Sequence, residues 1–392
     1  MQAVLNHPLF QPVVMTAVLI CAFPLLAGYI VLLERKLLAD FQVRLGPMRV
    51  GPHGLLQPLA DAVKLIVKED ILPTDTDGLI FWLAPCLSTI TAMSAFSVIP
   101  FSATLAVADV NVGILVISSL SSVGILGIIL GGWASNSHYS LLGSLRGGAQ
   151  LISYEVALAF ALLSGVMAAG TLSMQGIVKA QLTRGVWFAF DNFGLMLVPF
   201  MVYFIASIAE TNRAPFDLPE AESELVAGFM TEYSGFRWAL YFLAEYANIS
   251  VVASVAVTLF WGGWLRPFPS VAWLEIPLNY GVPAAVFLGT GAGTLLLIKR
   301  QKMAFQKIFL LVVAGALALC AIPFLIPIAN KAVIGVFWYF LKVAVIIYCM
   351  IWFRGTFPRF RYDQLMNIGW KILIPTGMGA VLVNAVVGML WR

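Results

Sequence analysis

The sequence predicts an all-α, polytopic integral membrane protein with about ten transmembrane helices. Hydrophobic residues make up 61% of the chain and charged residues 11%, whereas about 25% of a soluble domain is charged. Apolar runs of about 17–25 residues recur along the chain, and each is long enough to cross a bilayer as one helix. Lys and Arg gather in alternate loops between these runs, which is typical of a chain that crosses a membrane repeatedly.

The predicted spans can be placed one by one. The first run follows no Lys or Arg and is too long for the core of a signal peptide, so we expect it to remain as an anchor. The seventh run is the weakest, because it is short and rich in Gly and Thr. In order, the spans are Pro12–Leu33, Leu79–Ile99, Val110–Trp133, Ile152–Leu172, Val186–Ile208, Ala239–Trp264, Val282–Ile298, Ile308–Ala329, Val333–Phe353 and Trp370–Trp391.

Basic residues predict the orientation, because Lys and Arg favour cytoplasmic loops. With the N-terminus outside, the inner loops hold 17 Lys and Arg residues, the outer side holds five, and Lys342 lies within a span. We therefore expect both termini on the outer (periplasmic) side of a cell inner (plasma) membrane. The net charge of +4 then reflects membrane orientation, and no sequence feature supports nucleic-acid binding.

Cysteine and histidine are sparse and scattered. The four cysteines stand singly in four predicted spans, and the three histidines lie on three separate non-membrane segments. Zinc and iron–sulfur sites need clustered thiolates or imidazoles. We therefore expect no metal and no cofactor bound by this chain, so that any electrons it uses come from a partner.

The second half of the first long inner loop is predicted to form an amphipathic helix in the membrane interface. Leu59, Val63 and Ile66 recur at helical spacing, while Asp61 and Lys64 share another face. The helix is either a passive surface element, or Asp61 and Lys64 line the mouth of a cavity for an amphiphilic ligand. A turn rich in Gly and Pro precedes the helix and would let the backbone approach such a ligand closely.

The most informative segment lies between the fifth and sixth spans and carries six carboxylates against one base, Arg213. Carboxylates crowded at the edge of a low-dielectric slab repel one another, and burial disfavours their charged forms, so some pKa values should rise toward neutrality. A capping box would explain two of the acids, but a like-charged i,i+4 pair remains unfavourable. The pattern predicts coupling of a nearby charge event to proton movement. The six carboxylates are Glu210, Asp217, Glu220, Glu222, Glu224 and Glu232.

Among the charged residues of the predicted spans, Glu155, Glu245 and Lys342 are the informative ones, whereas Asp109 and Asp191 sit at span edges, where solvation costs little. Each of the three informative residues costs about 2.5–3.5 kcal/mol at the bilayer centre on insertion scales, so a functional role is the default interpretation. Structural pairing of Lys342 with one of the glutamates is one explanation. A buried proton relay that continues from the acidic loop is the preferred one.

At these residues the chain resembles the H-subunit family of proton-pumping NADH–quinone oxidoreductase (respiratory complex I), to which mitochondrial subunit 1 also belongs. The resemblance covers most of the chain in the family's order, and the combined motifs are highly specific. The matching segments are Glu34–Lys36, Arg44–Asp61, Gly132–Gly143, Ser153–Glu155, Glu210–Glu224, Glu232–Gly235 and Arg354–Gln364.

The resemblance implies a membrane-arm subunit that takes quinone as substrate, with no catalytic residue or redox centre of its own. It also implies partners: peripheral-arm quinone-site subunits, small membrane-arm subunits and membrane lipids, with FMN and iron–sulfur clusters in the partner subunits. The residues expected to line the quinone chamber or its entrance are Arg35, Asp61, Lys64 and Arg213. Those expected in the proton pathway are Glu34, Glu155, Glu210, Glu220, Glu222, Glu224, Glu245 and Lys342.

One departure from the family is visible in the second half of the chain. The family usually has eight spans, so residues 266–332 are interpreted as an insertion with two extra helices. Residues 1–265 would then form the membrane domain with two charged cytoplasmic loops (34–78 and 209–238), and residues 333–392 the last two family helices. Two alternatives stay open: the equivalent subunit of a membrane-bound hydrogenase-type complex, and a stand-alone secondary transporter, although no internal repeats of the transporter kind are found.

Overall fold

The computed structural model describes residues 10–219, 225–298 and 304–390 and contains helices but no strand within these ranges. Within the same ranges, nine helices are long and apolar enough to cross a membrane, and α8 is a shorter apolar helix. The prediction of an all-α, polytopic membrane protein is therefore confirmed. The α-helices are α2 (Phe10–Phe41), α3 (Gln57–Val67), α4 (Gly78–Ala95), α5 (Gly113–Ala134), α6 (His138–Ala169), α7 (Met174–Arg184), α8 (Leu197–Glu210), α10 (Gly235–Phe260), α11 (Val282–Ile298), α12 (Ala304–Leu325), α13 (Pro327–Thr356), α14 (Tyr362–Asn367) and α15 (Ile374–Leu390).

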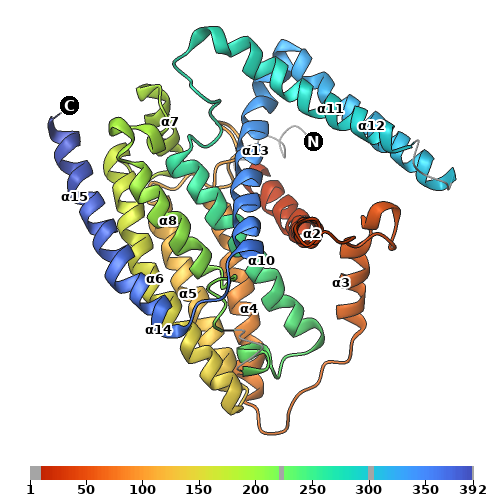
Figure 1. Ribbon diagram of the computed structural model, residues 1–392, viewed down its shortest axis with the longest axis vertical. Helices are drawn as coiled ribbons and strands as arrows, with labels where there is room; N and C mark the ends of the chain where they lie inside the picture. Colours follow the sequence, from red (N-terminus) through yellow and green to blue (C-terminus); the bar gives the residue numbers. More distant parts are fainter. Residues whose placement is uncertain (1–9, 220–224, 299–303, 391–392) are drawn as a thin grey trace.

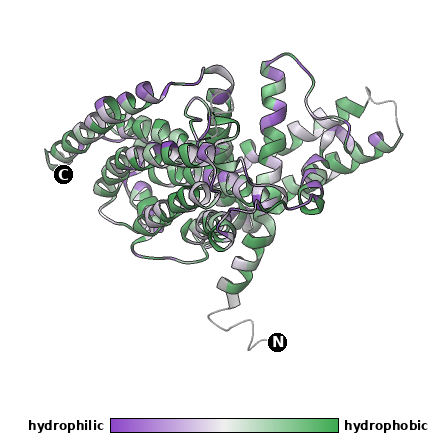
Figure 2. Cartoon of the chain, turned by 90° about the horizontal axis from the view of Figure 1, so that it is seen from below, coloured by the Kyte–Doolittle hydropathy of each residue, from purple (hydrophilic) through white to green (hydrophobic). Residues whose placement is uncertain are grey.

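The helices α4, α5, α6, α8, α10 and α15 form the main bundle, and α10 lies between α4 and α13 (Figure 1). Hydrophobic residues dominate most of these helices (Figure 2). The most apolar stretch of α10 is 78% buried, against 28% for α5, so α10 contacts protein on nearly every side. Charged residues on α10 therefore lie inside the protein and away from lipid.

Helix α6 begins earlier than predicted and runs through most of the polar inner loop, from His138. Close packing explains the difference, because a Cβ on Gly143 would lie 2.8 Å from the backbone of Gly228. A Cβ on Gly147 would lie equally close to the Pro219 ring. The glycines on this extension therefore let the acidic segment pack directly on α6.

The predicted span Val186–Ile208 is helical only in its second half, as α8. The first half forms two short 3-10 turns, in which Asn192 and Phe193 adopt positive φ angles of 51° and 58°. The Asp191 carboxylate accepts a hydrogen bond from the Asn192 N–H at 2.9 Å. This local bond favours a turn over a helix, which hydropathy alone did not indicate.

Helices α11 and α12 pair with each other as a hairpin that leans on α13 and extends away from the bundle (Figure 1). Only 17% and 22% of their most apolar stretches are buried. Asn330 Nδ2, on α13, fastens the hairpin by donating to the carbonyl oxygens of Asn279 at 3.0 Å and Phe324 at 2.8 Å. The rest of the hairpin has the composition of a lipid-facing element.

Helices α2 and α3 flank the bundle on one side (Figure 1). Helix α2 continues past the predicted end at Leu33, so Glu34 and Arg35 lie on its last turns. The predicted amphipathic helix is confirmed as α3, with Val63 61% and Ile66 65% exposed. Its polar face is turned toward α2 and α10, which together enclose the cavity described next.

Candidate functional site

A cavity of about 670 Å³ lies between α2, α3 and the start of α10. Arg35, Asp61 and Lys64 supply charges to a wall that is otherwise mostly apolar. Arg35 Nη1 pairs with Asp61 Oδ2 at 2.7 Å, and Gln57 Nε2 donates to Asp61 Oδ1 at 2.8 Å. A cavity of this size with a few convergent polar groups suits a ligand that has a polar head and an apolar tail.

A second cavity of about 320 Å³ adjoins the first and shares part of its wall, including Arg35 and Tyr246. It is lined by Glu34, Arg213 and Glu245. The fourth predicted chamber residue, Arg213, thus lies one step deeper than the other three. The two cavities together lead from the α2–α3 side into the bundle.

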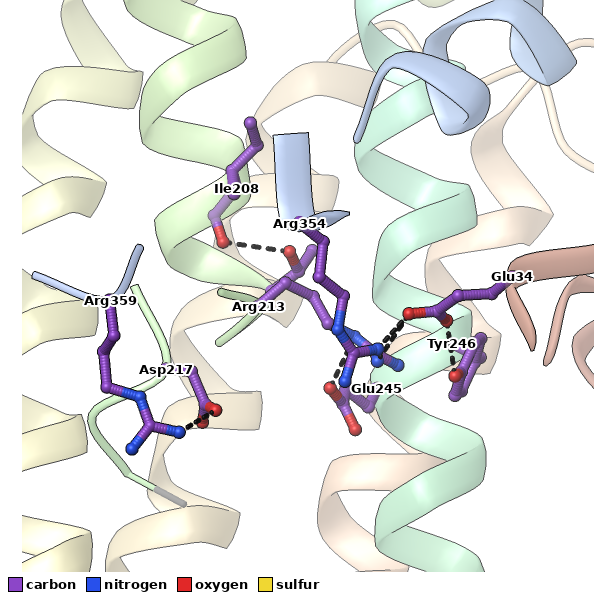
Figure 3. A network of polar contacts seen from close by, with 9 residues as sticks. Glu34, Ile208, Arg213, Asp217, Glu245, Tyr246, Arg354 and Arg359 are labelled. Atoms are coloured by element: carbon purple, nitrogen blue, oxygen red, sulfur yellow. Dashed lines mark hydrogen bonds and ion pairs between the residues drawn. The ribbon is translucent and has the colours of Figure 1, made fainter. Parts of the chain in front are cut away.

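The inner cavity contains a charged cluster, defined here as Glu34, Arg213, Glu245, Tyr246 and Arg354 (Figure 3). Arg213 forms ion pairs with Glu34 (Nη1 to Oε1, 3.3 Å) and with Glu245 (Nε to Oε1, 2.7 Å). Tyr246 Oη donates to Glu34 Oε2 at 2.6 Å, and Arg354 donates to Glu34 Oε1. The Arg213 guanidinium also lies 4.3 Å from the centre of the Tyr246 ring.

The charged cluster balances two guanidinium groups against two carboxylates in a largely buried site, where Arg354 alone keeps as much as 35% of its side chain exposed. Glu34 is 4% and Arg213 9% exposed. Burial of separate charges costs several kcal/mol per ion, and only close pairing offsets it. Because α2, α10, α13 and the segment after α8 each contribute a side chain, the cluster forms only once all four are in place.

The segment after α8 is held in place by Gln150 of α6, which is fully buried. Gln150 Nε2 donates to the carbonyl oxygens of Ala209 and Phe216, each at 2.8 Å. A turn between them is closed by the Phe216 N–H, which donates to the Arg213 carbonyl oxygen at 2.8 Å. These bonds fix the backbone on both sides of Arg213. The Arg213 side chain is therefore held beside Glu34 and Glu245.

A second connection joins the same segment to the chain after α13. Arg359 Nη2 donates to Asp217 Oδ2 at 2.8 Å, and the Phe360 N–H donates to the Pro215 carbonyl oxygen at 3.0 Å (Figure 3). Burial raises the pKa of Asp217 above its ordinary value, and the Arg359 guanidinium offsets this only in part. The capping box predicted from the sequence pairs Asp217 with Glu220, and two further acids, Glu222 and Glu224, follow it in the chain. Glu220, Glu222 and Glu224 lie outside the described residues.

Two further glutamates, Glu210 and Glu155, lie beyond the charged cluster. A small cavity of about 40 Å³ is lined by both Glu245 and Glu210, and a larger one of about 320 Å³ by both Glu210 and Glu155. Ser121 of α5 donates to Glu210, and Ser122 donates to Glu155. Even the small cavity is large enough for a water molecule. Hydroxyl groups and space for water therefore connect the three glutamates in sequence.

Lys342 lies apart from this row. Its Nζ donates to the carbonyl oxygens of Trp261, Gly263 and Leu265 at 2.7, 2.9 and 2.5 Å, just beyond the C-terminal end of α10. At about 1.5 Å per residue, Trp261 lies roughly 24 Å from Glu245 along that helix. The structure thus gives Lys342 the position of a helix cap, with three carbonyl oxygens as hydrogen-bond acceptors and the Trp187 ring centre 4.3 Å from its Nζ.

Sequence reasoning did not assign Arg354 or Tyr246 to the site. Arg354 opens a matching motif near the C-terminus, and Tyr246 directly follows Glu245. The sequence therefore offered a signal for each of these two residues. No spacing rule, however, brings Arg354 to Glu34, because the contact joins residues 320 positions apart.

No group of three or more His, Cys, Asp or Glu side chains suited to a metal ion occurs within residues 10–219, 225–298 and 304–390. The four cysteines are free thiols on four different helices. The site offers carboxylates, guanidinium groups and hydroxyls, which are groups that bind polar ligands and exchange protons.

Comparisons with known proteins identify the family of the chain. The family described as NADH dehydrogenase matches residues 13–385. The NADH-quinone oxidoreductase H subunit 2 of Solibacter usitatus is 72% identical over 392 residues, which covers all of both chains. The corresponding H subunit 1 of Koribacter versatilis is 51% identical over 91% of this chain and 87% of its own length. The H subunit of Magnetococcus marinus is 43% identical over 94% of this chain and 88% of its own length.

Proposed function

Because this chain belongs to the NADH dehydrogenase family, we propose that it is the membrane subunit of a proton-pumping NADH–quinone oxidoreductase that houses quinone and couples its reduction to proton movement. The observation that carries the proposal is the continuity of the site. A ligand-sized cavity opens onto the charged cluster, and the cluster opens onto a row of glutamates.

The first cavity supports the binding of quinone. A quinone has a polar ring and a long apolar tail, and the wall combines a few charged groups near Arg35 with extensive apolar surface from α2, α3 and α10. The exposed pair of Arg35 and Asp61 can reorganise at little cost, since surface ion pairs contribute about 0–1 kcal/mol. The mouth of the chamber is therefore held loosely, and its deeper wall tightly.

The charged cluster supports coupling. Reduction of a quinone to a quinol takes up two electrons, supplied in this proposal by a partner subunit, and two protons. A unit charge about 10 Å from a carboxylate changes the energy of its ionised form by about 1.7 kcal/mol at an effective dielectric constant of about 20. A change of that size shifts a protonation ratio more than tenfold. Glu34 and Glu245 are placed to respond to such a charge, and Glu210 and Glu155 to pass a proton onward.

The remaining expectations belong to the same proposal. The chain would lie in a cell inner membrane with both termini on the outer side. It would lie beside quinone-site subunits of the peripheral arm, with FMN and iron–sulfur clusters bound by partner subunits. Residues 266–332, which include the α11–α12 hairpin, would be an addition to the helices that build the chamber.

Substitution on α3 tests the chamber. Ala62 lines the first cavity, the one between α2, α3 and α10, whereas Ala60 lies on the same helix outside that cavity. We expect Ala62→Phe to raise the KM for quinone in the assembled oxidoreductase, because the ring fills the cavity, and Ala60→Phe to leave it unchanged. Photo-crosslinking with a quinone analogue gives a second measurement. Equal KM values for both variants, with labelling confined to residues outside 24–35, 57–68 and 227–246, would overturn the chamber assignment.

A further inference from the structure

A separate cavity of about 790 Å³ lies at the end of the bundle where α6 and α15 finish (Figure 1). Its wall includes Ala168 of α6, Arg184 at the end of α7, Asp191 in the turn that follows, and Asn384 of α15. Ala168 lies roughly 20 Å beyond Glu155 along α6, at about 1.5 Å per residue. This cavity is therefore distinct from the chamber and from the row of glutamates.

One positive and one negative group stand side by side in the wall. Arg184 pairs with Asp191 and also donates to the Ala168 carbonyl oxygen at 2.6 Å, while its guanidinium lies 5.2 Å from the Phe188 ring centre. The two side chains keep 30% and 21% of their surface exposed. A guanidinium has five N–H donors and a carboxylate about four acceptor positions. Both groups thus retain bonding capacity toward the cavity.

The rest of the wall combines amides with apolar surface. Asn192 Nδ2 donates to Asn384 Oδ1 at 3.3 Å, which ties the turn to α15 across the cavity. Met389 of α15 lines the apolar side. Phe190 and Phe193 flank it with 58% and 79% of their surface exposed, which adds to the apolar surface beside the cavity.

We propose that this cavity binds a zwitterionic phospholipid with a primary ammonium headgroup, of the phosphatidylethanolamine type. Arg184 would bind the phosphate, Asp191 the ammonium, and the apolar face of α15 an acyl chain. The paired wall charges sum to zero, so they match a zwitterion better than an anionic lipid. A quaternary ammonium has no N–H to donate to Asp191, so a choline headgroup should bind more weakly.

The test uses the assembled oxidoreductase, purified in detergent, stripped of lipid and titrated with phosphatidylethanolamine, phosphatidylcholine or phosphatidylglycerol. Bound lipid is counted by native mass spectrometry. We expect the wild type to retain phosphatidylethanolamine most tightly. Asp191→Asn should weaken that lipid about tenfold, the effect of one charge-assisted hydrogen bond, and remove its advantage over phosphatidylcholine. Arg184→Gln should weaken all three lipids, because each carries a phosphate.

Lys179→Gln is the matched control, since Lys179 is an exposed base on the same helix α7 that does not line the cavity. It should leave every lipid affinity unchanged. Free phosphoethanolamine, which lacks acyl chains, should not displace the bound lipid. Equal retention of the three lipids by the wild type, or tightest retention of phosphatidylglycerol, overturns the proposal, and this ranking decides the matter even where a variant fails to assemble.

Discussion

Removal of the central guanidinium of the charged cluster gives the sharpest test of how the site is held together. In Arg213→Met the side chain keeps much of its volume but loses its charge, so Glu245 loses its 2.7 Å ion pair inside the protein. Glu34 keeps Arg354 and the Tyr246 hydroxyl. Breaking a buried pair by removing one partner costs about 3–5 kcal/mol, because the other charge stays buried.

The matched control is Arg35→Met. Arg35 also pairs with a carboxylate at 2.7 Å, but the two side chains are 45% and 32% exposed, so its loss should cost about 0–1 kcal/mol. The double variant Arg213→Met/Glu245→Gln removes the stranded charge together with its partner. It should be more stable than Arg213→Met alone, giving a coupling energy of about 1–3 kcal/mol.

Free energies of unfolding of the purified protein, from denaturant titration in detergent, measure these differences. If Arg213→Met and Arg35→Met lower the free energy of unfolding equally, the charged cluster is hydrated and loosely held. The argument that it senses charge in a low-dielectric site would then be refuted. Absence of coupling between Arg213 and Glu245 would refute it independently.

Three further predictions follow from the same geometry. Glu210→Gln should depress quinone-linked proton pumping in reconstituted vesicles while assembly stays intact, whereas Glu275→Gln, at a 61% exposed carboxylate, should pump normally; unchanged pumping by the first variant would exclude Glu210 from the pathway. Gly143→Val should prevent stable packing, because its Cβ would lie 2.8 Å from backbone, and Gly289→Val, with nothing within 4 Å, should be tolerated; similar yields of folded protein from both would contradict the packing argument. Burial raises the pKa of Asp217 above its ordinary value of 3.8. Asp217 therefore binds a proton more tightly in the folded state than in the unfolded state. Its contribution to stability is therefore complete below pH 3.8 and falls as pH rises through the higher folded value. Unfolding of wild type and Asp217→Asn measured across pH should show this difference, and a stability difference that changes with pH in the opposite direction would contradict it.

Much of the fold was predictable, because membrane spans depend on local apolar length. The span at residues 186–208 shows where that rule fails. Its composition is apolar, yet Asp191 bonds to the next backbone N–H and Asn192 adopts a positive φ, so the chain turns before α8 begins. For α6 the sequence predicted too little helix, since the predicted span begins at Ile152 and the helix begins at His138. Gly143 weakens a helix prediction, but the helix is stabilised by packing that only the tertiary structure supplies.

The sequence indicated several of the charged residues of the site, but it did not indicate which of them contact one another. Charge density singled out Glu210 and Arg213, and intramembrane cost singled out Glu245. The bond that joins Arg354 to Glu34 depends on the packing of α13 against the bundle, which no local pattern encodes. For Lys342 the cost argument correctly indicated that the charge needs partners, but it did not show that three carbonyl oxygens supply them.

The order in which charges become buried predicts where the charge of a bound ligand would act most strongly. At the mouth, Arg35 and Asp61 are exposed, so mobile ions and water screen any change in charge within about 8–10 Å. Deeper in, Glu34 and Arg213 are buried, so the same change in charge is screened less and acts over a longer distance. A charge placed on a ligand between these two regions therefore perturbs the charged cluster more than the mouth. Since Glu245 shares a cavity with Glu210, the proposed function predicts that Glu245 and Glu210 respond to that perturbation before the mouth does.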